Sequence, residues 1–152
     1  IKLIREIVKD TDFLSKKCKP VSKKDNIAEI IQDLRDTAAA YEESHDCVGL
    51  AANQIGYDKD VIIIRIHPHG NYKEDKLFWM IMVNPVITNK TKEVIESEEG
   101  CLSLEGTRTV KRYNGVMVVY RDVRGKMQTS EFYGLEACIV QHEIDHLKGK
   151  LI

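Results

Sequence analysis

The sequence predicts an α+β fold in which antiparallel β-sheets enclose a central C-terminal helix, with a further helix near the N-terminus. Three observations predict it. A helical pattern begins near residue 26, several segments rich in Val, Ile, Thr and aromatic residues follow, and a second helical pattern closes the chain. The chain has 152 residues without a repeat or a linker. Residues 1–152 are therefore expected to form a single domain.

The first helix is expected between Asn26 and about Glu43. Asn26 followed by Glu29 has the spacing of a capping box, in which side chains at the helix start bond the free backbone N–H groups. One face of the segment then stays apolar through Ile27, Ile30, Ile31, Leu34, Ala38 and Tyr41.

Strand signals follow at residues 61–66, 79–84, 86–95, 110–120 and 126–132. Turns are expected at Asn84-Pro85, Asn114-Gly115 and Arg124-Gly125, because these residue pairs favour turn conformations. Residues 67–76 contain two histidines among charged residues. We expect an exposed loop there rather than a metal site.

The last helix carries the run Gln141-His142-Glu143-Ile144-Asp145-His146. Two histidines four residues apart project from one helical face, so both imidazoles can reach one divalent metal ion. Glu143 points about a quarter turn away, where it can act on a water molecule at the metal. The alternative is a pair of hydrogen-bonded histidines in the core, without a metal.

Two apolar stripes predict that this helix is covered on most sides. Leu135, Cys138 and Ile139 share the face of the two histidines, which places that face against the interior. The second stripe consists of Ala137, Val140, Ile144, Leu147 and Leu151.

Composition excludes some classes of function. The 23 basic and 24 acidic residues give a net charge of −1, so neither a nucleic acid nor an anionic membrane is an expected partner. No apolar run approaches the ~20 residues of a membrane span, and the N-terminus lacks the apolar segment of a signal peptide. We expect a cytoplasmic protein. Its four cysteines are too few and too scattered for a disulfide scaffold.

Cys101 is the candidate third ligand. It follows Gly100 at the end of a strand-like segment, where the backbone can turn and approach another group closely. A Cys and two His leave the fourth position of a tetrahedral site open for chemistry. The alternative role for Cys101 is that of a small buried apolar residue.

Together, three segments resemble the peptide deformylases. They are residues 49–56 (GLAANQIG), 99–103 (EGCLS) and 141–149 (QHEIDHLKG), in that family's order and at about its spacing. The resemblance covers essentially the whole chain. It implies an α+β fold with antiparallel sheets around a helix that carries HExxH, and removal of the formyl group from N-terminal formylmethionine.

The resemblance also implies roles for individual residues. Cys101, His142 and His146 match the family's metal ligands, and Glu143 matches its catalytic acid/base. The side-chain amide of Gln54 and the backbone N–H of Leu102 match the donors that stabilise the oxyanion.

The substrate and the supporting residues can be assigned in the same way. The segments of Gly49 and of Glu99-Gly100 match those that pair with the peptide backbone. The methionine pocket should be apolar, and Val48, Cys138 and Ile139 are its candidates, with plain core packing as their alternative role. Arg108 and Arg112 resemble arginines that brace the site, the latter by pairing with Asp145. Surface ion pairing is their alternative role.

Two departures from the family pattern stand out. Cys47 replaces a glycine two residues before Gly49, and residues 104–107 (LEGT) replace a turn that often contains proline. Neither affects a ligand, the base or an oxyanion donor, so activity is expected to survive.

Cofactor and partners follow from the same resemblance. Ferrous iron is the metal expected in the cell, with zinc, nickel or cobalt as alternatives. The expected partner is a nascent N-formylmethionyl peptide, the ribosome near its exit tunnel is a candidate partner, and the protein is expected to be a monomer. Two other functions stay open: a non-catalytic peptide-binding relative, and a zincin-like endopeptidase, against which the absence of a downstream His or Glu ligand argues.

Overall fold

Seven strands and three α-helices form the described part of the computed structural model, which covers residues 3–67 and 77–152. The helices are α1 (Thr11–Leu14), α2 (Ile27–His45) and α3 (Gly134–Leu147), and a 3-10 turn, η1, spans Ala52–Ile55. The strands are β1 (Gly49–Ala51), β2 (Val61–Ile66), β3 (Phe78–Lys90), β4 (Val94–Cys101), β5 (Leu104–Tyr113), β6 (Gly115–Arg121) and β7 (Met127–Tyr133). All but His67 of the expected loop 67–76 lies outside the described residues.

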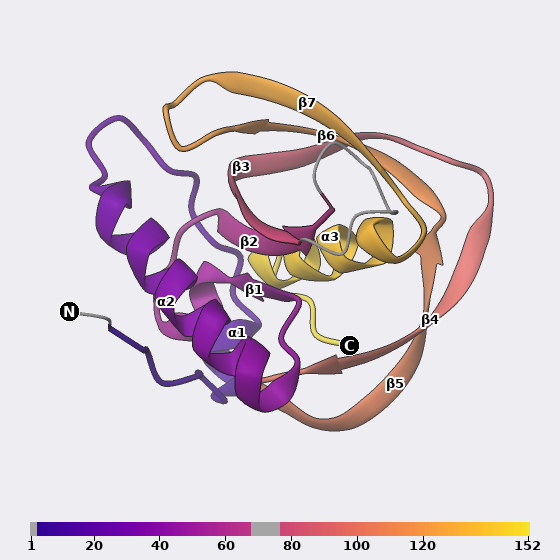
Figure 1. Ribbon diagram of the computed structural model, residues 1–152, viewed down its shortest axis with the longest axis horizontal. Coiled ribbons are helices and arrows are strands. Elements are labelled where there is room, and N and C mark those ends of the chain that lie inside the picture. The colour runs from indigo at the N-terminus through magenta and orange to yellow at the C-terminus, as the bar shows by residue number, and fades with distance from the viewer. Residues whose placement is uncertain (1–2, 68–76) are drawn as a thin grey trace.

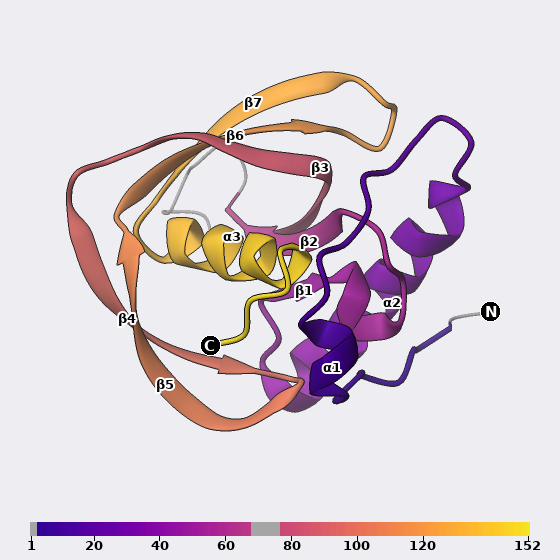
Figure 2. The same cartoon turned by 180° about the vertical axis from the view of Figure 1, so that it is seen from behind.

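The strands make two antiparallel sheets around α3, which confirms the predicted fold class. One sheet has five strands in the order β1-β2-β3-β6-β7, and the other is the hairpin of β4 and β5. Figures 1 and 2 show α3 between the larger sheet and the β4–β5 hairpin, while α2 lies outside this arrangement.

Strand β2 explains why the core has two layers. Its isoleucines at 62, 64 and 66 pack on α3 residues such as Val140 and Ile144. Val61 and Ile63 face the other way and join the cluster that contains Leu34 of α2. Because successive side chains of a strand point to opposite faces, a strand covered on both faces is mostly apolar, and in β2 only Arg65 departs from this.

Several predicted boundaries were wrong. Asn84-Pro85 is a bulge inside β3 rather than a turn, since the register with β6 shifts between Val83 and Val86 and β3 continues beyond it. The Asn84 side chain bonds the backbone of Val21 there, at 2.8 and 3.0 Å. The predicted strand over residues 86–95 is instead interrupted between Lys90, the last residue of β3, and Val94, the first residue of β4. Residues 110–120 divide at Asn114, the position of a predicted turn.

The helix ends also differ from expectation. Asn26 stands at the start of α2, but its side chain makes no capping bond. Helix α3 ends at Leu147 rather than near Leu151. Gly149, which follows, adopts a φ of +78° and packs so closely on Ser15 that a Cβ at residue 149 would overlap the Ser15 carbonyl oxygen. Leu135 was predicted to be buried, yet it is 74% exposed, because the first turn of α3 turns other residues, Glu136 and Ala137, toward the interior.

Candidate functional site

Helix α3 holds His142 and His146 side by side in the interior. They are 8% and 1% exposed, and their Nε2 atoms lie 3.1 Å apart. Apolar packing of the opposite face against β2 fixes the direction of both imidazoles. Two ring nitrogens of the same kind therefore point at one spot.

The C-terminal end of β4 brings Cys101 to the same position. Its Sγ lies 3.4 Å from His146 Nε2, and the three candidate ligand atoms all lie within 4.8 Å of one another. In a tetrahedral site with bonds of about 2.0 Å to nitrogen and about 2.3 Å to sulfur, neighbouring ligand atoms are about 3.3 to 3.6 Å apart. The observed separations of 3.1 and 3.4 Å fit that geometry. One soft and two imidazole ligands suit a divalent transition metal.

A buried ion-pair network orients His142. Glu99 Oε1 lies 2.8 Å from His142 Nδ1, and Arg112 donates two hydrogen bonds to Glu99, at 2.7 and 3.0 Å. Burial alone would raise the pKa of Glu99, but the bonds from His142 and Arg112 lower it to about 2. A charged Glu99 keeps the proton on Nδ1 and leaves Nε2 free as a ligand atom.

The same arginine ties the hairpin to the helix. Arg112 of β5 donates a hydrogen bond of 2.6 Å to Asp145 of α3, which is the pairing that the resemblance implied. Arg108 lies on the same strand with an exposed side chain, and none of the hydrogen bonds or ion pairs among the described residues includes it.

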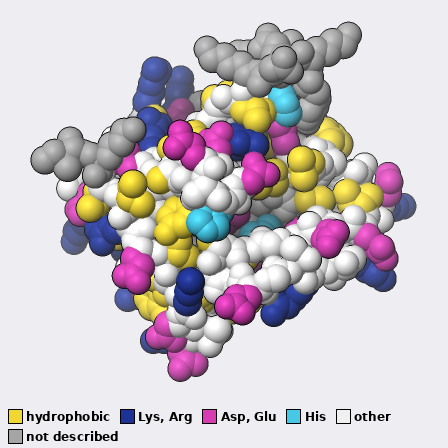
Figure 3. Space-filling model, turned by 60° about the horizontal axis from the view of Figure 1, so that its bottom comes forward, with side chains coloured by type: hydrophobic (Ala, Val, Ile, Leu, Met, Phe, Trp, Pro, Cys, Tyr) yellow, Lys and Arg dark blue, Asp and Glu magenta, His cyan; other side chains and the backbone are white. Residues whose placement is uncertain are grey.

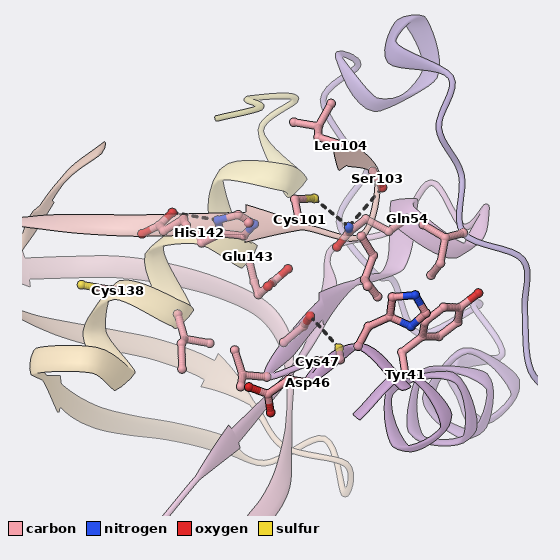
Figure 4. Close-up of a pocket in the computed structure, with 18 of the residues that line it drawn as sticks. Tyr41, Asp46, Cys47, Gln54, Cys101, Ser103, Leu104, Cys138, His142 and Glu143 are labelled. Carbon is pink, nitrogen blue, oxygen red and sulfur yellow. Dashed lines mark hydrogen bonds and ion pairs between the residues drawn. The ribbon is translucent and has the colours of Figure 1, made fainter. Parts of the chain in front are cut away.

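Glu143 has the properties of a proton acceptor. It is 4% exposed, and its Oε1 has no hydrogen-bond partner among the described residues. Burial raises the pKa of its carboxyl to about 7. Gly49 of β1 makes room for it, since a Cβ at residue 49 would lie 2.6 Å from Glu143 Oε2. Figure 4 shows the carboxylate beside Cys101 and His142.

Gln54 completes the group from η1. Its Oε1 accepts a bond from the backbone N–H of Ala51 at 3.0 Å, which turns the amide nitrogen toward the site. Nε2 lies 3.3 Å from Cys101 Sγ and 3.2 Å from Ser103 Oγ, as the dashed lines in Figure 4 show. The amide can donate to an oxygen placed over the ligand group.

A cleft of about 900 Å³ opens onto these residues. Figure 3 shows a hollow on one face of the molecule with histidine side chains near it. The predicted site residues that line the cleft are Val48, Gly49, Gln54, Glu99, Gly100, Cys101, Leu102, Cys138, Ile139, His142 and Glu143.

Three residues have side-chain contacts in the site that the sequence did not predict. The Glu99 side chain binds His142 and Arg112, although only its backbone was expected to matter. Ser103 contacts Gln54, and Asn53 Nδ2 donates to the backbone carbonyl of His146 at 2.8 Å. All three residues lie within the segments that carry the family resemblance, but only the fold shows what their side chains touch.

Comparisons with known proteins agree with the geometry. A family model described as polypeptide deformylase matches residues 4–152. The peptide deformylase of Clostridium beijerinckii is 41% identical over 150 residues, covering 99% of this chain and 100% of that one. The crystal structure of a class I type b peptide deformylase from Acinetobacter baumannii with bound Met-Ala-Ser superposes with a TM-score of 0.83 at 34% identity, covering 99% and 97% of the two chains. A Legionella pneumophila peptide deformylase is 38% identical, with a TM-score of 0.81 over 98% and 83% of the two chains.

Proposed function

The chain belongs to the peptide deformylase family, and from this premise we propose that it removes the formyl group from the N-terminal formylmethionine of newly made polypeptides. One observation carries the proposal. The Cys101, His142 and His146 ligand atoms converge. The unpaired Oε1 of Glu143 and the Gln54 amide nitrogen belong to the same cleft, which Cys101 and His142 also line.

Cys101, His142 and His146 would hold the metal on which the family depends. A divalent cation held there would supply the Lewis acidity that lowers the pKa of water to near neutral pH. We propose ferrous iron as the ion in the cell, with zinc, nickel or cobalt able to replace it. The donor set supports a transition metal in general, since thiolate and imidazole are ligands that all of these ions accept.

Glu143 moves the proton in this mechanism. Its buried carboxylate takes a proton from the attacking water and later delivers it to the departing amine. A carboxyl whose pKa lies at about 7 suits both tasks near neutral pH. Meanwhile the Gln54 amide and the Leu102 N–H donate to the formyl oxygen as it gains negative charge, and each such donor is typically worth ~3 kcal/mol.

The cleft would hold the substrate in a defined direction. Cys138 and Ile139, one turn before His142, form with Val48 the apolar pocket proposed for the methionine side chain. The backbones of Gly49, Glu99 and Gly100 would pair with the peptide. Arg112 and Asp145 would support Glu99 and His142 from behind. The exposed side chain of Arg108 makes no such contact among the described residues, so the proposed bracing role rests on Arg112.

The setting in the cell is part of the proposal. We propose a cytoplasmic monomer of one domain that acts on nascent chains near the ribosomal exit tunnel. Within residues 3–67 and 77–152, none of the helices is long and apolar enough to cross a membrane.

The test is an assay of formate. Protein loaded with iron or nickel is incubated with formyl-Met-Ala-Ser, and Glu143→Ala is the matched control. We expect rapid formate release by the wild type and a loss of at least ~100-fold in the variant. Equal release by both proteins would refute the role of Glu143. No release by either would favour a peptide-binding relative, and cleavage of internal peptide bonds would indicate an endopeptidase.

A further inference from the structure

Ser103 lies in the turn between β4 and β5, two residues after Cys101. It is 5% exposed, and its Oγ accepts a hydrogen bond from Gln54 Nε2 at 3.2 Å. We propose that Ser103 is a positioning residue that aims the Gln54 amide at the formyl oxygen. The inference rests on the proposed function and adds a residue to its machinery.

The orientation of the Gln54 amide is fixed at its oxygen. Oε1 accepts the N–H of Ala51 at 3.0 Å, so an inverted amide would bring an NH₂ group against another N–H donor. This contact decides which end of the amide faces the cleft. One bond at Oε1 still leaves the plane of the amide free to tilt about that contact.

Ser103 removes this freedom. An amide nitrogen carries two hydrogens, and Ser103 Oγ holds one of them. The other points toward Cys101, whose Sγ accepts it at 3.3 Å, and so faces the group of candidate metal ligands. Figure 4 shows Gln54 between these two residues. Because Ser103 and Cys101 belong to the same turn, one piece of backbone places both a metal ligand and the support of an oxyanion donor.

The expected effect is a loss of rate without a loss of binding. Removal of a whole oxyanion donor costs about 10²- to 10³-fold in kcat. Ser103→Ala leaves the donor present and only poorly aimed, so we expect a roughly tenfold fall in kcat with KM within about twofold of the wild type.

A double-mutant cycle tests whether Ser103 acts through Gln54. Ser103→Ala, Gln54→Ala and the double variant are assayed with formyl-Met-Ala-Ser, together with metal content and melting temperature. In the Gln54→Ala background, Ser103→Ala should lower kcat no further. Ser130→Ala is the matched control. Ser130 lies on β7, outside the cleft, and its Oγ is 3.0 Å from the hydroxyl oxygen of Tyr120 on β6.

A second readout does not depend on turnover. Nuclear magnetic resonance of ¹⁵N-labelled protein should show the Gln54 side-chain N–H pair exchanging at least tenfold faster in Ser103→Ala than in the wild type. Unchanged exchange would overturn the proposal, as would unchanged kcat or an equal loss in both backgrounds of the cycle. A wild type that releases no formate would refute the proposed function instead, while the exchange rates still decide whether Ser103 holds the amide.

Discussion

Replacement of Gly49 by alanine should slow the reaction without disturbing the metal ligands. The added Cβ would lie 2.6 Å from Glu143 Oε2, 3.0 Å from its Cγ and 3.1 Å from its Cδ. Ordinary contacts between such atoms begin at about 3.4 Å, so the carboxylate has to retreat by roughly 0.8 Å.

That displacement sets the expected magnitude. A misplacement of about 1 Å in a reacting group can cost about 100-fold in rate. We expect kcat to fall by roughly 50- to 100-fold in Gly49→Ala, which corresponds to about 2.5 kcal/mol in the barrier. KM should change far less, because most of the apolar lining of the cleft is untouched.

The assay compares kcat and KM for formyl-Met-Ala-Ser at matched metal content. Melting temperature and metal per chain serve as controls, because neither Gly49 nor the carboxyl of Glu143 is a proposed ligand. A well-folded variant with kcat within twofold of the wild type would refute the reasoning. It would mean that Glu143 need not occupy the position in which the structure holds it.

The other predictions concern the metal and its surroundings. Cys101→Ser should lower metal content measured on anaerobically prepared protein, and unchanged content would show that the third ligand is misassigned. Removal of the metal with a chelator should abolish formate release and lower the melting temperature, with both restored by nickel, since a ligand bound only to the folded state stabilises it. Glu99→Gln should lower the melting temperature near pH 7. Because the pKa of Glu99 is depressed to about 2 in the folded protein, its contribution is present above its ordinary pKa and lost as the pH falls toward 2. The gap between variant and wild type should therefore narrow in acid, and a constant gap would contradict the ion-pair account.

The sequence predicts a helix or strand well when the pattern of apolar and polar residues within that element determines its limits. The four-residue apolar stretch from Val61 to Ile64 and its flanks predicted the limits of β2, and the spacing of His142 and His146 predicted their shared direction. Asn84 shows the opposite case. Strand β3 continues past Asn84, where the local sequence predicts a turn. The Asn84 side chain bonds Val21, 63 residues away, and no local pattern contains that contact.

The two arginines of β5 show the same limit within the site. Arg108 and Arg112 lie four residues apart, so alternation along the strand assigns them to one face. Arg108 lies opposite Glu99 in the β4–β5 ladder, but it is the Arg112 side chain that bonds Glu99 and also reaches Asp145 of α3. The position of α3 against one end of β5 therefore decides that Arg112 is buried and Arg108 is exposed, and the sequence of β5 does not contain that information.

The shortness of β1 has a consequence for substrate range. It has only three residues and forms one edge of the five-stranded sheet. At about 3.3 Å per residue it offers a ladder roughly 10 Å long. A polypeptide that adds to this edge can be held along its first two or three residues only. Beyond that length β1 cannot select a sequence, so selection along this edge is limited to the residues nearest the N-terminus of the bound chain.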